Sequence, residues 1–324
     1  MKSQTVPDMR KNENHTIYFI KAIACMFVVF IHIPFAGKTG EMISQIARFA
    51  VPLFFMISGY YYAGCENMAD RIRVTKKSIK KLMKILLPAC MIYFIYNYYR
   101  CCFIEGTSPE TFRQLLFSGN SIKWLIYYNY PASYTYHGHL WYMFAIIYVY
   151  VIAIFIRKES VKLWVIGVLL AFIYGVELVA ANTELSIPTF YYRNWILGLA
   201  MFLTGEWIRI REEKIKAFLG NRKLLAVSIG SILLLATVEY QTLPIFEVYI
   251  SSVLIAAGLL IFAIQVPNVR VLNFTGKYSS SYIYIYHYVY SFFLRNTLAN
   301  TGGGYTTYIL WGYTFLWQFC YMQS

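Results

Sequence analysis

Long apolar segments alternate with short polar ones along the whole chain. Most of the apolar segments have about the 20 residues that an α-helix needs to cross the hydrocarbon core of a bilayer. They are continuously apolar, whereas a transmembrane β-strand alternates apolar and polar positions. The pattern therefore predicts an all-α, polytopic membrane protein with about ten transmembrane helices, at residues 16–36, 43–63, 82–104, 138–156, 162–182, 190–208, 223–239, 247–266, 279–297 and 305–321.

The composition also favours a membrane protein. Hydrophobic residues make up 59% of the 324 residues and charged residues only 14%. A typical soluble domain is about 25% charged, so an ordinary cytosolic enzyme and a disordered chain are both excluded. None of the six cysteines belongs to a CxxC pair, so we expect neither a disulfide framework nor a metal site. With no repeat or linker in the sequence, residues 1–324 are interpreted as one transmembrane domain.

The net charge of +14 is explained by membrane topology. Lys and Arg gather in the cytoplasmic loops of membrane proteins. When each basic residue is assigned to the nearer end of its predicted span, 21 fall on the side of the N-terminus and 6 on the opposite side. Two more, Lys21 and Arg48, lie inside spans. We therefore expect both termini in the cytoplasm of a multi-pass protein, with the lipid bilayer as its partner and no nucleic acid.

Two ionisable residues lie in the first predicted span, Lys21 and His32. Such residues are costly inside a membrane and are functional candidates for that reason. They are eleven residues apart, close to three helical turns, so they share one face and lie about 16 Å apart along the axis. Two interpretations stay open: a cation and a general base on one stripe, or a snorkelling lysine with a packed histidine.

A cationic helix face precedes the third span. Lys77, Lys80, Lys81 and Lys84 follow the i, i+3, i+4, i+7 spacing of one helix face. Such a face suits a phosphate-bearing ligand or anionic lipid headgroups. The same lysines also serve as a topology signal without any ligand, and that alternative stays open.

Ser58 and Gly59 lie in the second span, where small residues let helices approach closely. A nucleophilic Ser58 is conceivable, but packing is the favoured interpretation. His137 and His139 are two residues apart, so they do not share a helix face, and further metal ligands are not found. Beside Trp141, His139 also fits an interfacial aromatic belt.

Two more charged residues, Glu177 and Arg193, fall near the outer end of their spans. Their opposite charges and similar depth suggest that they form a pair.

Taken together, the motifs resemble the acyltransferase-3 family, bacterial integral membrane proteins that acylate cell-surface carbohydrates and related acceptors. The resemblance covers nearly the whole chain, and the matching residues are Lys21 with His32, Phe54-Phe55-x-x-Ser58-Gly59, Lys81-x-x-Lys84, His139-Leu140-Trp141-Tyr142, Arg193-Asn194-Trp195 and Tyr286-His287. The sequence departs from the family pattern at Tyr18, where the family has Asp, and at three positions where Lys replaces Arg. Lysine keeps the charge but loses bidentate recognition of phosphate.

The resemblance implies a membrane O-acyltransferase of the bacterial cytoplasmic membrane. It would transfer an acyl group, expected to be acetyl, from cytoplasmic acyl-CoA to a hydroxyl of an extracytoplasmic carbohydrate or cell-envelope acceptor. Acyl-CoA would be a co-substrate, with no permanently bound cofactor and no metal. The implied site residues are His32, His139 and Tyr142 for catalysis, Lys21, Lys81 and Lys84 for the donor, and Arg193, Asn194, His287 and Ser58 for the substrate.

A transporter is the alternative function. The Arg193-Asn194-Trp195 stretch also resembles the membrane half of membrane-bound serine racemases, which suggests transport of serine or of a lipid-linked glycan. Intramembrane charges suit either class. The transporter interpretation is weakened because the sequence has no internal repeat halves and no pair of Gly/Pro-broken helices.

Overall fold

The chain folds into helices in a computed structural model. The structure describes residues 13–32, 35, 37–65, 67–119, 121, 123, 140–183, 185, 187–188, 192–220, 222–243, 246–272, 275–279 and 285. Within these ranges the chain contains helices and turns but no strand, so the all-α prediction is confirmed there. The elements are α1 (His15–His32), α2 (Gly37–Ile46), η1 (Ala47–Phe49), α3 (Ala50–Tyr62), α4 (Met68–Tyr99), η2 (Arg100–Ile104), α5 (Pro109–Leu116), α7 (Trp141–Ala153), α8 (Glu159–Asn182), α9 (Asn194–Ile210), α10 (Glu212–Leu219), α11 (Arg222–Thr242), α12 (Ile250–Gln265) and η5 (Thr275–Ser279).

Apolar helices of membrane-spanning length are present among the described residues. Four segments are long and apolar enough to cross a bilayer: His15–His32, Gly37–Tyr62, Glu159–Asn182 and Leu224–Thr242. The helices α7 and α12 are apolar but shorter. The predicted spans at 279–297 and 305–321 lie almost entirely outside the described residues, so the number of about ten helices stays a prediction.

The third predicted span is part of a longer helix than the apolar pattern indicates. Helix α4 has 32 residues and starts at Met68, fourteen residues before the predicted start. Asn67 caps it by accepting a hydrogen bond from the Asp70 backbone N–H, 2.8 Å away. At 1.5 Å per residue the helix is about 48 Å long, well beyond the roughly 30 Å of a hydrocarbon core. Its lysine-rich first half therefore continues directly into the apolar half.

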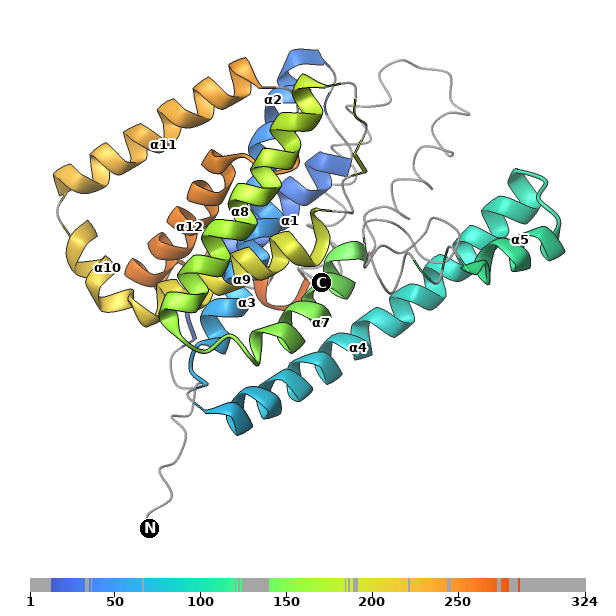
Figure 1. Ribbon diagram of the computed structural model, residues 1–324, viewed down its shortest axis with the longest axis horizontal. Helices are drawn as coiled ribbons and strands as arrows, with labels where there is room; N and C mark the ends of the chain where they lie inside the picture. The colour runs from blue at the N-terminus through green and yellow to red at the C-terminus, as the bar shows by residue number, and fades with distance from the viewer. Residues whose placement is uncertain are drawn as a thin grey trace, which may run out of the picture.

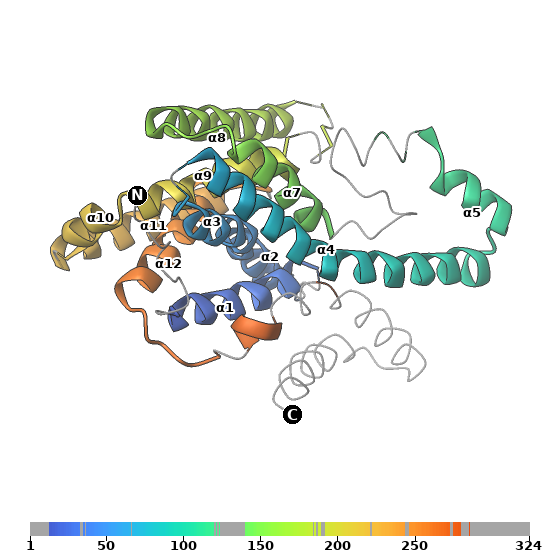
Figure 2. The ribbon, with the colours of Figure 1, turned by 90° about the horizontal axis from the view of Figure 1, so that it is seen from below.

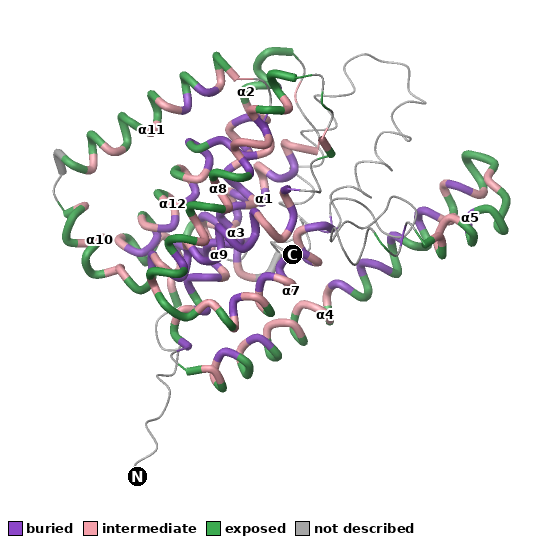
Figure 3. The backbone as a smooth tube through the Cα atoms, in the orientation of Figure 1, coloured by how far each residue is buried: buried purple, intermediate pink, exposed green. Residues whose placement is uncertain are grey.

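Helices α3 and α9 lie at the centre of the molecule, surrounded by α1, α7, α8 and α12 (Figures 1 and 2). Helix α4 runs along one side and carries α5 away from the centre, and α10 and α11 lie on the opposite side. Burial follows this order, since the central helices are mostly buried and α11 is largely exposed (Figure 3). Exposed apolar side chains on α8 and α11 fit a lipid environment, where no hydrophobic penalty applies.

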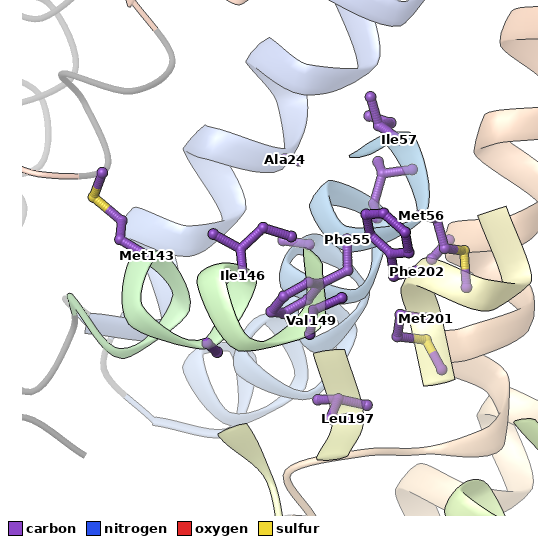
Figure 4. Packing of buried hydrophobic residues seen from close by; sticks show 14 of the residues in the cluster. Ala24, Phe55, Met56, Ile57, Met143, Ile146, Val149, Leu197, Met201 and Phe202 are labelled. Carbon is purple, nitrogen blue, oxygen red and sulfur yellow. The ribbon is translucent and has the colours of Figure 1, made fainter. Parts of the chain in front are cut away.

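The contact between α3 and α9 depends on two glycines. A Cβ on Gly59 would lie 1.9 Å from the backbone oxygen of Phe202, and a Cβ on Gly205 would lie 1.9 Å from that of Met56. The two backbones thus approach each other through the missing side chains. Around this contact the aromatic and aliphatic side chains interdigitate, as Phe55 and Phe202 do in Figure 4. Gly59 is therefore a packing residue, as the sequence suggested for this motif.

A buried ionic cluster joins α4, α8 and α9. The Arg71 guanidinium contacts the Glu206 carboxylate at 3.1 Å, and the Lys162 ammonium contacts the same carboxylate. Arg71 also donates to the carbonyls of Ala153, at 2.5 Å, and Ile156, at 3.2 Å, near the end of α7. These carbonyls balance the surplus positive charge of the cluster, since helix C-termini favour cations. The cluster holds four elements together without a solvent-exposed group.

Candidate functional site

An ion-pair cluster lies at the end of the helical bundle where α1 ends, at His32. Arg48, in the turn between α2 and α3, donates from Nη1 to Oε2 of Glu247 at 2.8 Å. Arg193, just before α9, donates from Nη1 to the same oxygen at 2.7 Å. We call Arg48 and Arg193 the arginine pair. His32 lies close enough to interact electrostatically with the Glu247 carboxylate.

Two buried carboxylates fix the segment that carries Glu247. Glu177, on α8, accepts hydrogen bonds from the backbone N–H groups of Glu247, at 3.1 Å, and Val248, at 3.4 Å. Glu239, on α11, accepts from the N–H groups of Ile250, at 3.0 Å, and Ser251, at 2.9 Å. These two N–H groups belong to the first turn of α12, which lacks intrahelical partners for them. The segment is thus anchored to α8 and α11, and Glu247 is positioned by backbone contacts.

The cluster is mostly buried but not sealed. The side chains of Arg48 and Arg193 are each 15% exposed, and that of Glu247 is 20% exposed. Burial disfavours a lone carboxylate, but the two guanidinium groups that donate to Glu247 favour its ionised form. Two guanidinium groups thus share one carboxylate, and the Glu177 carboxylate also lies within electrostatic range of Arg48 and Glu247.

The position of Arg193 is also set by an aromatic ring. Its guanidinium carbon lies 4.6 Å from the centroid of the Trp141 ring, a cation–π contact. The sequence suggested that Arg193 pairs with Glu177, but in the structure Arg193 contacts Glu247, and Glu177 binds backbone N–H groups instead. The sequence analysis did not single out Glu247. The sequence does contain a signal for it: Glu247 is an acidic residue at the start of an apolar segment, on the same predicted side of the membrane as Arg48 and Arg193.

Ser58 lies inside the bundle beside two tyrosines. Its hydroxyl donates to the backbone carbonyl of Phe54 at 2.9 Å and lies near the hydroxyls of Tyr142 and Tyr150. The Tyr142 ring lies 4.6 Å from that of Phe55, and its hydroxyl interacts with Cys25 on α1. These contacts place Ser58 and Tyr142 in the interior, in the stretch between Lys21 and His32. Their roles in binding and catalysis stay predictions.

The donor residues implied by the family resemblance lie toward the His15 end of α1. Lys21 is half-buried and interacts electrostatically with Lys81, so α1 and α4 bring these two cations together. Lys81 and Lys84 are exposed on α4, whereas Leu82 and Leu86 on the same helix pack inward. This burial pattern agrees with the predicted cationic face.

Three predicted site residues remain: Asn194, His139 and His287. Asn194 is buried as the first residue of α9, next to Arg193. His139 and His287 lie outside the described residues. Within the described part of the chain no group of three or more His, Cys, Asp or Glu side chains is arranged to hold a metal ion.

Comparison with known proteins identifies the family. No curated protein and no solved structure matches this chain. The family model Acyl_transf_3, described as an acyltransferase domain, matches residues 14–321, which is essentially the whole chain. The chain, with its apolar helices of membrane-spanning length, therefore belongs to the acyltransferase-3 family of membrane acyltransferases.

Proposed function

We propose that this acyltransferase moves an acyl group, acetyl by preference, from cytoplasmic acyl-CoA to a hydroxyl of an extracytoplasmic carbohydrate or cell-envelope acceptor. The observation that carries the proposal is the distribution of charge along α1. Cations from α1 and α4 lie toward its His15 end, and a histidine lies at its other end. In this proposal the His15 end faces the cytoplasm of a bacterial cell, in line with the bias of Lys and Arg.

The donor's own chemistry matches this separation. A CoA thioester carries its phosphates at one end and its reactive carbonyl at the other, joined by a flexible pantetheine arm. Lys21, Lys81 and Lys84 would hold the phosphates, since ammonium groups bind phosphate as point charges. The arm would then follow α1 past Tyr142 and Ser58, whose hydroxyls would be available to hydrogen-bond its amides. The thioester would reach the neighbourhood of His32.

His32 would act as the general base. Its neutral imidazole takes the proton of the acceptor hydroxyl as the hydroxyl oxygen attacks the thioester carbonyl. The resulting tetrahedral oxyanion needs hydrogen-bond donors, and Tyr142 and Asn194 are the candidates among the described residues. When the intermediate collapses, the carbon–sulfur bond breaks and the thiolate of CoA leaves with the proton from the imidazolium. The products are an acyl ester of the acceptor and free CoA.

The decisive experiment separates the two substrates by a membrane. In sealed right-side-out vesicles, radiolabelled acetyl-CoA trapped inside should acylate an extract of cell-envelope glycans supplied only outside. The same donor supplied only outside should give no labelled product, because its phosphates must bind on the cytoplasmic side. Product formation from external donor would overturn the transmembrane arrangement. Uptake of the glycan or of serine without acyl transfer would favour a transporter.

Charge reversal on α4 should weaken donor binding selectively. In Lys81→Glu with Lys84→Glu, two attractive contacts to phosphate become repulsive, so the apparent KM for acyl-CoA should rise at least about tenfold. The KM for the acceptor should stay near that of the wild type. Replacing both lysines by arginine restores bidentate donors and should lower the KM for acyl-CoA below the wild-type value.

A matched control separates phosphate binding from topology. Arg157→Glu with Lys158→Glu changes the charge equally at two exposed residues of the same predicted side. This variant should keep the donor KM of the wild type. An unchanged donor KM in the Lys81/Lys84 variant, with correct insertion, would contradict phosphate binding there. Inverted insertion of that variant would show that the lysines act as a topology signal.

A further inference from the structure

We propose that the arginine pair, Arg48 and Arg193, binds an anionic group of the acceptor, a phosphate or a carboxylate, beside His32. This inference rests on the proposed function, because it names the class of acceptor that would bind at the same site. The anion site itself is inferred from the structure alone. The argument uses the charge of the cluster, its unused hydrogen-bond donors and its fixed geometry.

Within the three-residue cluster, two positive charges face one negative charge, and the nearby carboxylate of Glu177 is engaged with backbone N–H groups. Two guanidinium groups share one carboxylate oxygen, Oε2 of Glu247, and the three side chains are at most 20% exposed. A buried surplus charge is costly unless a counter-charge or several dipoles offset it. His32 adds a further positive charge each time it takes a proton as the general base. An anion bound to the arginine pair would offset both.

The buried cluster around Arg71 gives an internal comparison. It has the same ratio of charges, because two cations contact the single carboxylate of Glu206. There the surplus charge is met by the carbonyls of Ala153 and Ile156. Among the described residues, no carbonyl contact of Arg48 or Arg193 plays this part. The Arg71 cluster thus has carbonyl partners for its surplus charge, whereas the arginine pair has none of this kind in the described part of the chain.

The hydrogen-bond donors lead to the same conclusion. A guanidinium group has five N–H donors, and each arginine of the pair gives one Nη1 donor to Glu247. The Nε atoms of Arg48 and Arg193 are buried, and neither has a hydrogen-bond partner within the described part of the chain. A buried donor without an acceptor is costly. The fork of Nε and Nη donors matches the two oxygens of a phosphate or carboxylate.

The geometry of the pair is fixed before any ligand arrives. Arg193 lies on the Trp141 ring, and Glu247 is anchored through the backbone contacts of Glu177 and Glu239. Arg48 lies in the short turn that joins α2 to α3. Little side-chain entropy is therefore lost on binding, which favours affinity. Each arginine side chain keeps an exposed fraction of 15%.

The test uses ligand-induced thermal stabilisation of the purified full-length protein in neutral detergent. Three probes are compared at equal ionic strength: glucose 1-phosphate, glucuronate and methyl glucoside. A ligand that binds only the folded state raises the Tm, and at equal ligand concentration the tighter binder raises it more. The two anions should raise the Tm of the wild type, and the neutral methyl glucoside should not. The larger of the two shifts assigns phosphate or carboxylate as the preferred group.

The variants of the cluster should change the apparent Kd in opposite directions. Arg193→Gln and Arg48→Gln each remove a charged donor and should weaken anion binding about 10- to 100-fold. Glu247→Gln removes the competing carboxylate, so it should lower the Tm without ligand and tighten anion binding about tenfold. A purely structural role of the cluster would destabilise all three variants without this reversal. Arg113→Gln is the matched control, because Arg113 is exposed on α5 and its pairing with Glu110 is local.

Separate outcomes decide the inference and the proposed function. The inference is overturned if neither anion raises the Tm of the wild type, or if the shift survives in the variant with both Arg48→Gln and Arg193→Gln. It is also overturned if Lys81→Gln with Lys84→Gln abolishes the shift, since the anion would then bind at the other end. The stabilisation assay needs no acyl transfer. A failed vesicle experiment with the expected Tm pattern would therefore reject the acceptor role and keep the anion site.

Discussion

Replacement of His32 by alanine should lower the rate of acyl transfer at least about 100-fold, the usual contribution of a general base. His32 is the last residue of α1 and lies within electrostatic range of Glu247, next to the arginine pair. The carboxylate stabilises the imidazolium that forms when His32 takes the proton of the acceptor. The rate is measured as CoA release and as label in the acceptor, with membrane protein quantified in parallel.

Two further variants sharpen this test. His32→Gln keeps a polar side chain but cannot take the proton, so it should lose as much rate as His32→Ala. His15→Gln changes the other histidine of the same helix, at the opposite end of α1, and should keep most of the rate. Near-wild-type transfer by both His32 variants, with normal insertion, would show that His32 is a packed histidine and not the base.

Gly59→Ala and Gly205→Ala should each destabilise the folded protein by at least about 2 kcal/mol, the scale of overpacking in a tight interior. The new Cβ would lie 1.9 Å from a backbone oxygen of the facing helix in both cases. A backbone oxygen does not rotate away as a side chain does, so α3 and α9 must separate. Stability is measured by reversible unfolding in mixed detergent micelles, and less folded protein should be recovered from membranes.

Other helical glycines provide controls for this prediction. Gly258 on α12 and Gly230 on α11 have no atom within 4 Å of an added Cβ. Alanine at either position should be neutral or stabilise by up to about 1 kcal/mol, because alanine is the better helix former. The variant with both Gly59→Ala and Gly205→Ala should cost less than the sum of the two, since one separation of the helices relieves both contacts. Equal stability of Gly59→Ala and Gly258→Ala would contradict the close approach.

Sequence patterns are sufficient where a feature depends on neighbouring residues in one helix. The apolar segments predicted α1, α3, α7, α8, α9, α11 and α12 because crossing a bilayer requires about 20 apolar residues in a row. The short polar helices α5 and α10 were not predicted. The lysine face of α4 followed from helical spacing alone, and its residues are exposed as expected. The motif resemblance led to the acyltransferase-3 family, which the match over residues 14–321 confirms. The start of α4 at Met68 was missed because a polar helical extension leaves no apolar signal.

Contacts between distant elements were decided only by the tertiary structure. Glu247 meets Arg48, 199 residues away, and Arg193, 54 residues away. Sequence alone offered Glu177 as the partner of Arg193, because both residues lie at a similar depth. The structure assigns Glu177 to the backbone of the segment 247–248 instead. Depth along a helix can be read from the sequence, whereas the rotation and neighbours of each helix depend on how α3 and α9 pack. The arginine pair is therefore a product of the assembled fold.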